Sequence, residues 1–241
     1  MRIETDIVLY RASLFSYNAQ IVQIVMVMLN LQFQVQAIDT ENDEHMQDWY
    51  KELNPNYCDT IGSIPVITDT LSDGEKITLF DTATILEYIT ERYDNESRIK
   101  AHFGRKSNLQ ATSWLYWVLG YLAPLQLQAI FAIRPSEGMD RKTQDYLTNE
   151  LRRLYRNLDD LIKKSTHGYM VGDRPTIADI ACFGWVYEHS NAGISIEEFE
   201  EFSNVQRWRW NMFNWIKTRV DEVGMASQFE DMCAAYSQLR M

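Results

Sequence analysis

The chain has 241 residues, 46 % of them hydrophobic, and a formal net charge of −11. A chain of this length and composition can bury a substantial core, which excludes disordered and fibrous proteins. Binding a nucleic acid requires a basic face that neutralises phosphates, so no nucleic-acid partner is expected. Any anionic ligand must be held by local donors rather than by the overall charge.

Three cysteines, Cys58, Cys182 and Cys233, are widely spaced and form no CxxC pair, zinc pattern or disulfide framework. We interpret them as reduced thiols in the cytoplasm, and no metal site is predicted. The N-terminus has no secretory pattern, and the most apolar early segment, 21–31, is too short to span a bilayer. A cytoplasmic protein without a membrane partner is therefore expected.

The first 94 residues mix strand and helix patterns. An apolar β-type run at 7–10 precedes an apolar helix at 18–29, an alternating strand at 33–38 and a short helix ending at 54–56. Strands at 63–67 and 77–80 flank a turn at 71–76, and helical spacing occupies 82–93. The order β-α-β-α-β-β-α predicts a mixed sheet with helices on its faces.

After Asp94 the strand patterns stop, and a polar linker is predicted over 95–106. One long helix is expected over 109–133, with bends at Gly120 and Pro124. Further helical periodicity occupies 141–163, 176–187, 205–218 and 222–239. The sequence therefore predicts two domains, 1–94 and 106–241, of which the second is all-helical.

Three motifs follow one another in this framework. Ser63-Ile64-Pro65-Val66 opens a strand, Asp81-Thr82 opens a helix, and Thr176 with Asp179 forms a capping box. Together with the element order, they resemble the glutathione transferase family over nearly the whole chain. The resemblance implies a thioredoxin-like domain (1–94) followed by an all-helical domain (106–241), with glutathione as the co-substrate.

The resemblance also implies how glutathione would be held. Pro65 would follow a cis peptide bond, and Ile64 would offer its main-chain N–H and C=O to the cysteinyl part, like an added strand. Thr82 and the free N–H groups of its helix would hold the γ-glutamyl carboxylate, while Asp81 accepts from the ammonium group. Without the resemblance, Pro65 also fits a proline of an edge strand, and Asp81-Thr82 also fits an ordinary helix N-cap.

The segment Tyr17-Asn18-Ala19-Gln20-Ile21 looks like the Pro-Asn-Gly-x-Lys segment of a fungal and bacterial class that includes nitrogen-regulator-like transferases of yeast. In that class an Asn amide faces the thiol, which implies catalytic roles for Asn18 and for Ser16 two residues before it. Tyr17, Ala19 and Ile21 depart from the pattern, and the loop is about one residue longer, so Ser13 or Tyr17 remains an alternative. His45 matches a histidine that reaches the glycyl end of glutathione, or else it is a solvated surface residue.

A second-substrate pocket is expected between the Asn18 loop and the long helix. Trp117 and Tyr121 are four residues apart and suit a flat apolar molecule, although core packing is an alternative for each. Arg134 would hold an acidic substrate or cap its helix. Cys58 lies in an insertion-like stretch, 57–61, which is expected to form a loop beside the glutathione site. We interpret Cys58 as a solvated bystander thiol, with a mixed disulfide to glutathione as the alternative.

The predicted function is conjugation of glutathione to a small electrophile that is apolar or aromatic, as in fungal secondary metabolism. Two alternatives remain: glutathione-dependent reduction of disulfides or peroxides, and a regulatory protein that binds glutathione but has weak catalysis. The resemblance also implies a homodimer in which the first domain of one subunit contacts the helical domain of the other.

Overall fold

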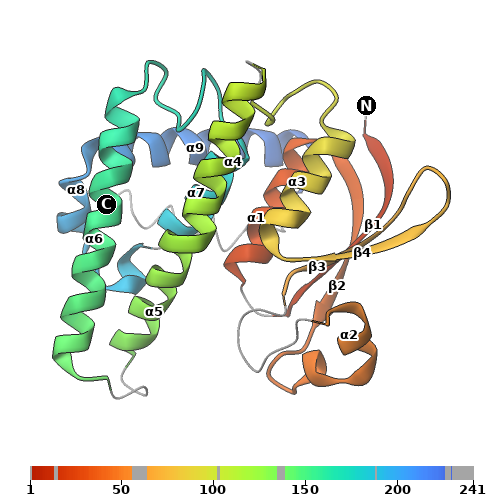
Figure 1. Ribbon diagram of the computed structural model, residues 1–241, viewed down its shortest axis with the longest axis horizontal. Coiled ribbons are helices and arrows are strands. Elements are labelled where there is room, and N and C mark those ends of the chain that lie inside the picture. The colour runs from red at the N-terminus through yellow and green to blue at the C-terminus, as the bar shows by residue number, and fades with distance from the viewer. Residues whose placement is uncertain are drawn as a thin grey trace. The chain divides into compact units, whose positions relative to one another are not determined.

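Figure 1 shows the computed structural model, which describes residues 2–13, 16–55, 64–101, 104–134, 139–187, 189–225 and Phe229. The chain divides into two compact units, Met1–Ile99 and Lys100–Met241. The predicted segment 57–61, the first residue of the strand predicted at 63–67 and most of the helix predicted at 222–239 lie outside the described residues.

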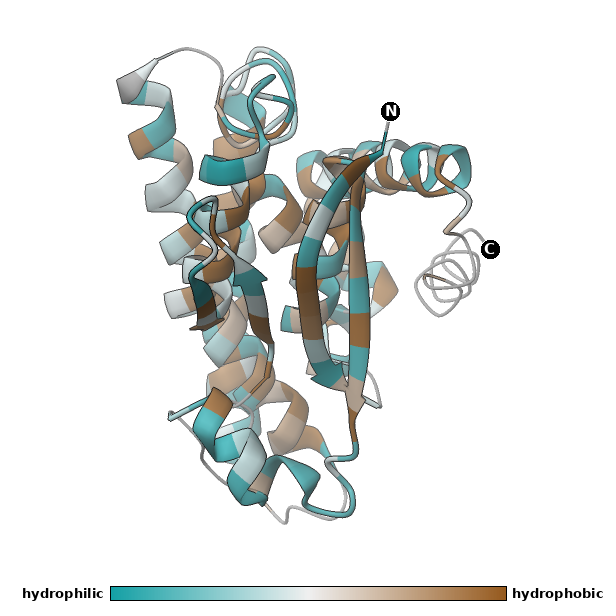
Figure 2. Cartoon of the chain, turned by 90° about the vertical axis from the view of Figure 1, so that its right-hand side faces the viewer, coloured by the Kyte–Doolittle hydropathy of each residue, from teal (hydrophilic) through white to brown (hydrophobic). Residues whose placement is uncertain are grey.

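The first unit is built on a four-stranded sheet in the order β2-β1-β3-β4. Its strands are β1 (Ile3–Ala12), β2 (Leu31–Ile38), β3 (Val66–Thr70) and β4 (Lys76–Phe80). β2 runs parallel to β1, whereas the pairs β1–β3 and β3–β4 are antiparallel. The predicted mixed sheet is confirmed. Figure 2 shows the hydrophobic and hydrophilic residues that alternate along the two long strands.

The helices of this unit are α1 (Tyr17–Met28), α2 (Asp48–Leu53) and α3 (Thr82–Tyr93), with a short 3-10 turn, η1 (Glu44–Met46), before α2. α1 and α3 contact each other and cover one face of the sheet (Figure 1). α1 is buried without interruption from Ile21 to Met28, which its apolar composition allows because it packs against the sheet and against α3. The predicted order of elements is confirmed, with α3 at its predicted bounds.

The second unit is helical in its described residues. It contains α4 (Arg105–Trp117), η3 (Val118–Leu122), α5 (Ala123–Ile133), α6 (Arg141–Lys164), α7 (Ile177–Val186), η4 (His189–Ala192), α8 (Ile196–Glu200) and α9 (Ser203–Glu222). α6 contacts α5 and α9, and α7 contacts α4 and α9. α7 begins at the predicted capping box: the main-chain N–H of Thr176 donates to Oδ2 of Asp179 at 3.0 Å. Asp179 also accepts from Met170 N–H and from the Trp208 indole, both at 2.9 Å.

The helix predicted over 109–133 is present, but its middle is a π-helical turn, η3, that joins α4 to α5. The N–H of Ala123 bonds to the carbonyl of Val118 five residues earlier. Pro124, which has no N–H to donate, lies in the first turn of α5, directly after the wide turn. The predicted irregularity near Gly120 and Pro124 is therefore a π turn.

The stretch Lys106–Ile133 has the length and apolar composition of a membrane span, a test that core helices of soluble proteins also pass. Gln126 in this stretch is fully buried within the helical unit. Its side-chain amide donates to the carbonyl of Trp185 at 2.6 Å and accepts from the Tyr155 hydroxyl at 2.7 Å. These bonds place this part of the stretch in the core of the helical unit.

Four sequence predictions need correction. The third strand begins at Val66, because Ile64 and Pro65 precede it outside the β ladder, and α4 begins at Arg105, inside the predicted linker. The helix predicted at 205–218 extends over 203–222, so Glu222 ends that helix instead of starting another. Neither η4 nor α8 was predicted. α8 has only five residues, too few for a helical pattern of hydrophobic residues to be recognised in the sequence. Its start nevertheless carries a capping box formed by Ser195 and Glu198.

Candidate glutathione site

One end of the sheet gathers the segments that carry the predicted glutathione ligands. Val66, the first residue of β3, lies opposite both Tyr10 of β1 and Phe80, the last residue of β4. Ala12 at the end of β1 lies opposite Ile38 at the end of β2. The residues that precede β3 and those that follow β1, β2 and β4 therefore leave the sheet at the same end.

A small apolar cluster supports this end of the sheet. Ala12, Ala19, Ile38, Tyr50, Ile64 and Val66 are its buried members. Tyr50 of α2 is fully buried, and burial raises the pKa of its hydroxyl. The cluster joins α1, α2 and three strands, so the main chain around it is held from several directions. Tyr50 lies in the predicted short helix that ends at 54–56, and nothing in its sequence context marks it as a member of this cluster.

The peptide bond between Ile64 and Pro65 is cis, as predicted. Ile64 is 8 % exposed, and its side chain belongs to the apolar cluster. Among the described residues, no main-chain hydrogen bond involves the N–H or C=O of Ile64, because the ladder begins at Val66. An extended ligand can therefore pair with this residue as a further strand would.

The start of α3 follows directly after β4. Asp81 is its N-cap, with φ 71° and ψ 130°, a conformation that costs free energy at a residue with a side chain. The Asp81 carboxylate accepts from the N–H groups of Ala83 (2.9 Å) and Thr84 (3.4 Å). The N-cap interpretation of Asp81 is thus correct. The N–H of Thr82 is not engaged by this cap, and it lies at the positive end of the helix, which favours an anion.

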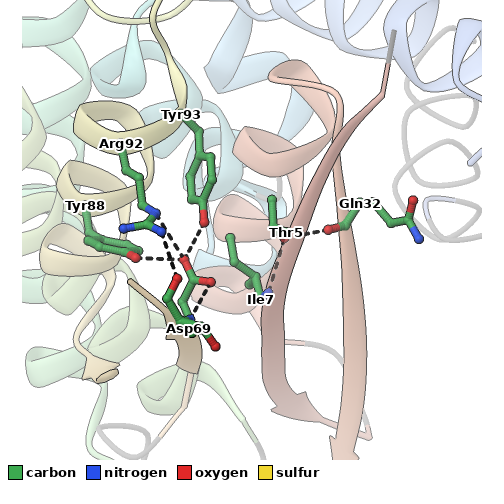
Figure 3. Close-up of polar contacts among 8 residues, drawn as sticks. Thr5, Ile7, Gln32, Asp69, Tyr88, Arg92 and Tyr93 are labelled. Atoms are coloured by element: carbon green, nitrogen blue, oxygen red, sulfur yellow. Dashed lines mark hydrogen bonds and ion pairs between the residues drawn. The ribbon is translucent and has the colours of Figure 1, made fainter. Parts of the chain in front are cut away.

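A buried polar network anchors the last turns of α3 to β3 (Figure 3). Asp69 of β3 is 2 % exposed and accepts hydrogen bonds from the hydroxyls of Tyr88 (2.7 Å) and Tyr93 (2.5 Å). Arg92 lies 3.7 Å from the same carboxylate and donates to the carbonyl of Thr70 at 2.8 Å. Burial, together with the bond to Asp69, raises the pKa of Tyr93 to about 12 and also raises that of Tyr88. No local sequence pattern predicted this network.

The start of α1 carries the residues predicted to face the thiol. Ser16 is the N-cap, and its hydroxyl oxygen accepts from Ala19 N–H at 3.4 Å, so this side chain stabilises the helix. Asn18 is half-buried, and among the described residues its Oδ1 is buried without a hydrogen-bond partner. Ser13 is exposed, and its N–H bonds to the carbonyl of Ile38.

His45 lies in η1, on the segment that follows β2. Its side chain is 8 % exposed, so the interpretation as a solvated surface histidine is wrong. Nδ1 is buried and has no hydrogen-bond partner within the described part of the chain. A buried polar atom without a partner is costly, and a bound ligand would relieve that cost.

The residues predicted for a second-substrate pocket lie on the long helix of the second unit. Trp117, at the end of α4, is half-buried and its ring meets that of Trp114 edge-on, with centroids 5.3 Å apart. Tyr121 is 65 % exposed. Arg134 is the C-cap of α5, and its guanidinium lies 4.7 Å from the ring centroid of Phe131. Arg134 therefore occupies a helix-capping position, the alternative given for it above.

Two family models match the chain. A model of the glutathione S-transferase N-terminal domain matches residues 15–92, and a model of the C-terminal domain matches residues 122–215. The first model covers the start of α1 and the sheet end with its cis proline, and the second covers most of the helical unit. The chain belongs to the glutathione S-transferase family.

Similar proteins include the glutathione S-transferase verG of Clonostachys rogersoniana, 26 % identical over 67 % of this chain. That alignment covers 65 % of verG, so the chain spans slightly less than two thirds of this relative's length. The transferase URE2P6 of Phanerochaete chrysosporium, solved with oxidised glutathione, superposes with a TM-score of 0.79 at 21 % identity, over 96 % of this chain and 98 % of that one. A transferase of Pseudomonas putida, solved with glutathione disulfide, gives 0.74 at 26 % identity over 86 % of each chain.

Proposed function

We propose that this protein binds glutathione at the sheet end described above and transfers its thiolate to a small electrophile. The carrying observation concerns Ile64, beside a cis proline, and the start of α3 at Thr82. Within the described part of the chain the Ile64 main chain makes no hydrogen bond, and the two positions flank directly opposed strand residues, Val66 and Phe80. In this proposal Ile64 pairs with the cysteinyl main chain. Thr82 binds the γ-glutamyl carboxylate, and the Asp81 carboxylate accepts from the ammonium group.

Asn18 and His45 complete the proposed site. Each has a buried polar atom without a partner among the described residues, and each follows a strand that ends at this edge. Asn18 would hold the thiolate and His45 the glycyl end, with Ser16 keeping the start of α1 in place. The glutathione disulfide in the Pseudomonas putida structure supports a ligand of this class for the chain.

The chemistry that follows is nucleophilic substitution or addition. A free thiol has a pKa of about 8.5, so only a few per cent is ionised at pH 7. A shift of about two units by Asn18 and the start of α1 raises the thiolate roughly twenty-five-fold, while intrinsic nucleophilicity falls about eightfold. The thiol proton goes to solvent, sulfur bonds to the electrophilic carbon, and a leaving group departs or the adduct takes up a proton. Positioning of the second substrate must supply most of the rate.

Trp117 and Tyr121 are the residues we propose for an apolar or aromatic second substrate, with Arg134 as a contact for an acidic group. The half-buried Trp117 ring and the exposed Tyr121 ring offer flat apolar surface. The similarity to verG supports conjugation, and a role in fungal secondary metabolism remains part of the proposal. The cytoplasm is the proposed location.

One observation favours a second candidate, a glutathione-binding protein with weak catalysis. The residues that replace Gly and Lys of the resembled segment, Ala19 and Ile21, are both buried in the core of the first unit. A segment built into the core in this way can keep its fold after losing activity. Disulfide or peroxide reduction with glutathione remains the other alternative.

Glutathione binding separates these proposals from a fold that no longer has the site. The protein should be retained on glutathione-agarose and should gain thermal stability; at a concentration of 100 Kd the stabilisation is about 2.7 kcal/mol. Turnover of an aromatic electrophile then separates the transferase from the regulator, and turnover of a disulfide tests the reductase. Absence of both retention and stabilisation would contradict the proposed site.

A further inference from the structure

Within the described residues, no strand pairs with the outer edge of β2. β2 is the first strand in the order β2-β1-β3-β4, and four consecutive residues, 34–37, are exposed. Val35 among them is 42 % exposed. The strand Leu31–Ile38 contains no charged residue, proline or glycine, in a chain with a net charge of −11. In Figure 2 it is the outer member of the pair of long strands.

The hydrogen bonds of β2 show which main-chain groups face outward. The carbonyl of Gln32 accepts from the Thr5 hydroxyl of β1 at 2.6 Å (Figure 3), and the carbonyl of Ile38 accepts from Ser13 N–H at 2.8 Å. Successive residues of a strand direct these groups to opposite sides. The N–H and C=O groups of Leu31, Phe33, Val35 and Ala37 therefore point away from β1, toward the open edge.

The other edge of the same sheet is protected. β4 has five residues against eight for β2, and Asp73, Glu75 and Lys76 precede or begin it, while Asp81 follows it. Short length and charged residues are the usual means by which proteins prevent edge strands from pairing. The irregularity in the β1–β2 pair, between Glu4 and Val8, adds its extra residues to β1 and leaves β2 regular. β2 thus has none of the protection that β4 has.

We propose that the β2 edge pairs in antiparallel fashion with the β2 edge of a second copy of this chain, about a two-fold axis at Gln34. In this register all residues from Leu31 to Ala37 are paired, with about eight main-chain hydrogen bonds. Phe33 of each copy lies opposite Val35 of the other, so an aromatic ring covers the exposed valine of this strand. Gln32 lies opposite Gln36 on the other face.

A second copy fits this edge for two reasons. The period-two pattern of glutamine and apolar residues is self-complementary about Gln34, because glutamine always faces glutamine and apolar always faces apolar. The strand is also free of the acidic residues that would make two copies of this chain repel each other. A single pair of edge strands forms a small interface, so the contact is weak and reversible.

Disulfide trapping tests the register. Gln34→Cys is made in a background with Cys58→Ser and Cys233→Ser, which leaves Cys182, a fully buried thiol whose pKa burial raises. Two Cys at the axis lie opposite each other, within disulfide range, and diamide accepts the two electrons and two protons that the thiols lose. Gln36→Cys, on the same face and also exposed, is the matched control. Its two copies would be about 13 Å apart and cannot be linked.

We expect covalent dimers from the Gln34→Cys protein at least ~10-fold faster than from the Gln36→Cys protein. Adding Val35→Lys should abolish this difference, because a charge then faces Phe33 of the second copy; Val35 is exposed, so the melting temperature should not change. Equal linking of the two cysteine variants, no linking of Gln34→Cys, or linking that Val35→Lys leaves intact would each overturn the proposal. None of these outcomes depends on glutathione binding.

Discussion

At the scale of single residues, Asp81 determines which hydrogen-bond donors in the first turn of α3 remain for a ligand. The carboxylate of Asp81 already occupies the N–H groups of Ala83 and Thr84. An incoming carboxylate must therefore use the N–H and hydroxyl of Thr82. One hydroxyl thus becomes the deciding donor for the γ-glutamyl group in the proposed site.

Replacing Thr82 with Ala should weaken glutathione binding by about 10- to 100-fold, the effect of losing one hydrogen bond to a charged group. Thr84→Ala is the control, because Thr84 is exposed and its N–H remains bonded to Asp81. Isothermal titration calorimetry measures both. Equal affinities of the two variants would place the carboxylate elsewhere.

Asn18 should affect the ionisation of the glutathione thiol rather than the affinity for glutathione. We expect Asn18→Ala to lower turnover at pH 7 by only about threefold, since greater thiolate content and lower nucleophilicity nearly offset each other. The midpoint of the pH–rate profile should instead rise by up to about two units. An unchanged profile with normal glutathione affinity would transfer the role to Ser13, Ser16 or Tyr17.

Residue identity alone could suggest these positions but could not fix their environments. The helix start at Thr82 was predictable because an acid followed by a hydroxyl is an N-terminal pattern. The burial of His45 was not, since it depends on how η1 folds against the rest of the unit. Asp69 was also missed, because its partners Tyr88, Arg92 and Tyr93 lie 19 to 24 residues away along the chain.

At the scale of elements, the Asp69 network determines how α3 is seated on β3. Its acceptor is buried and its donors come from two successive turns of the helix. Asp69→Ala would leave two hydroxyls without their acceptor and Arg92 without its ion pair. Each unsatisfied group costs about 1–3 kcal/mol, so we expect a loss of about 2–6 kcal/mol in the free energy of unfolding. Urea denaturation measures it, and a change below about 1 kcal/mol would show that the network contributes little.

The same network predicts alkaline sensitivity. The pKa of Tyr93 rises from about 10 in the unfolded chain to about 12 in the folded one. Because the neutral hydroxyl is the form that the fold favours, its contribution is complete below pH 10 and is lost between about pH 10 and 12. Tyr93→Phe should flatten the fall of the melting temperature over that interval, with Tyr146→Phe, an exposed tyrosine, as the control.

Helices were predicted well where the helical period of hydrophobic residues continued for several turns, as in α3 and α6. Prediction failed where tertiary contacts decide the local structure. Short elements such as α8 and η4 contain too few residues for a period to emerge. The boundary of β3 depends on its pairing with β1 and β4, which no local pattern records.

At the scale of the whole molecule, charge is distributed unevenly. Between Lys106 and Arg134 no residue is charged, although 24 % of the chain is. Leu109, Tyr116, Tyr121 and Ile133 of this stretch have exposed side chains. From this exposed surface we propose the homodimer that the family resemblance implies, in which the helical domain of one subunit contacts the first domain of the other.

We expect Leu109→Glu to weaken this dimer, because it introduces an acidic side chain into the uncharged surface. Tyr146→Glu is the control, since it places the same charge at an equally exposed site on α6. Sedimentation velocity measures the dissociation constant, which should rise about tenfold or more only for Leu109→Glu. Added salt should strengthen the wild-type dimer, since it screens two chains that each carry −11. A monomeric wild-type protein would contradict the proposal.

The π turn at Val118–Leu122 lets the long helix absorb a change in length. Its hydrogen bond from Ala123 spans five residues where an α-helical bond spans four, so the turn holds one extra residue. Removing that residue would let ordinary α-helical bonds close the turn, and the side chains from Ala123 onward would keep nearly their present direction relative to α4. Gln126 would then retain both its bond to the Trp185 carbonyl and its bond from Tyr155. Natural relatives that lack this residue can therefore keep the same side chain at this position in the helical core.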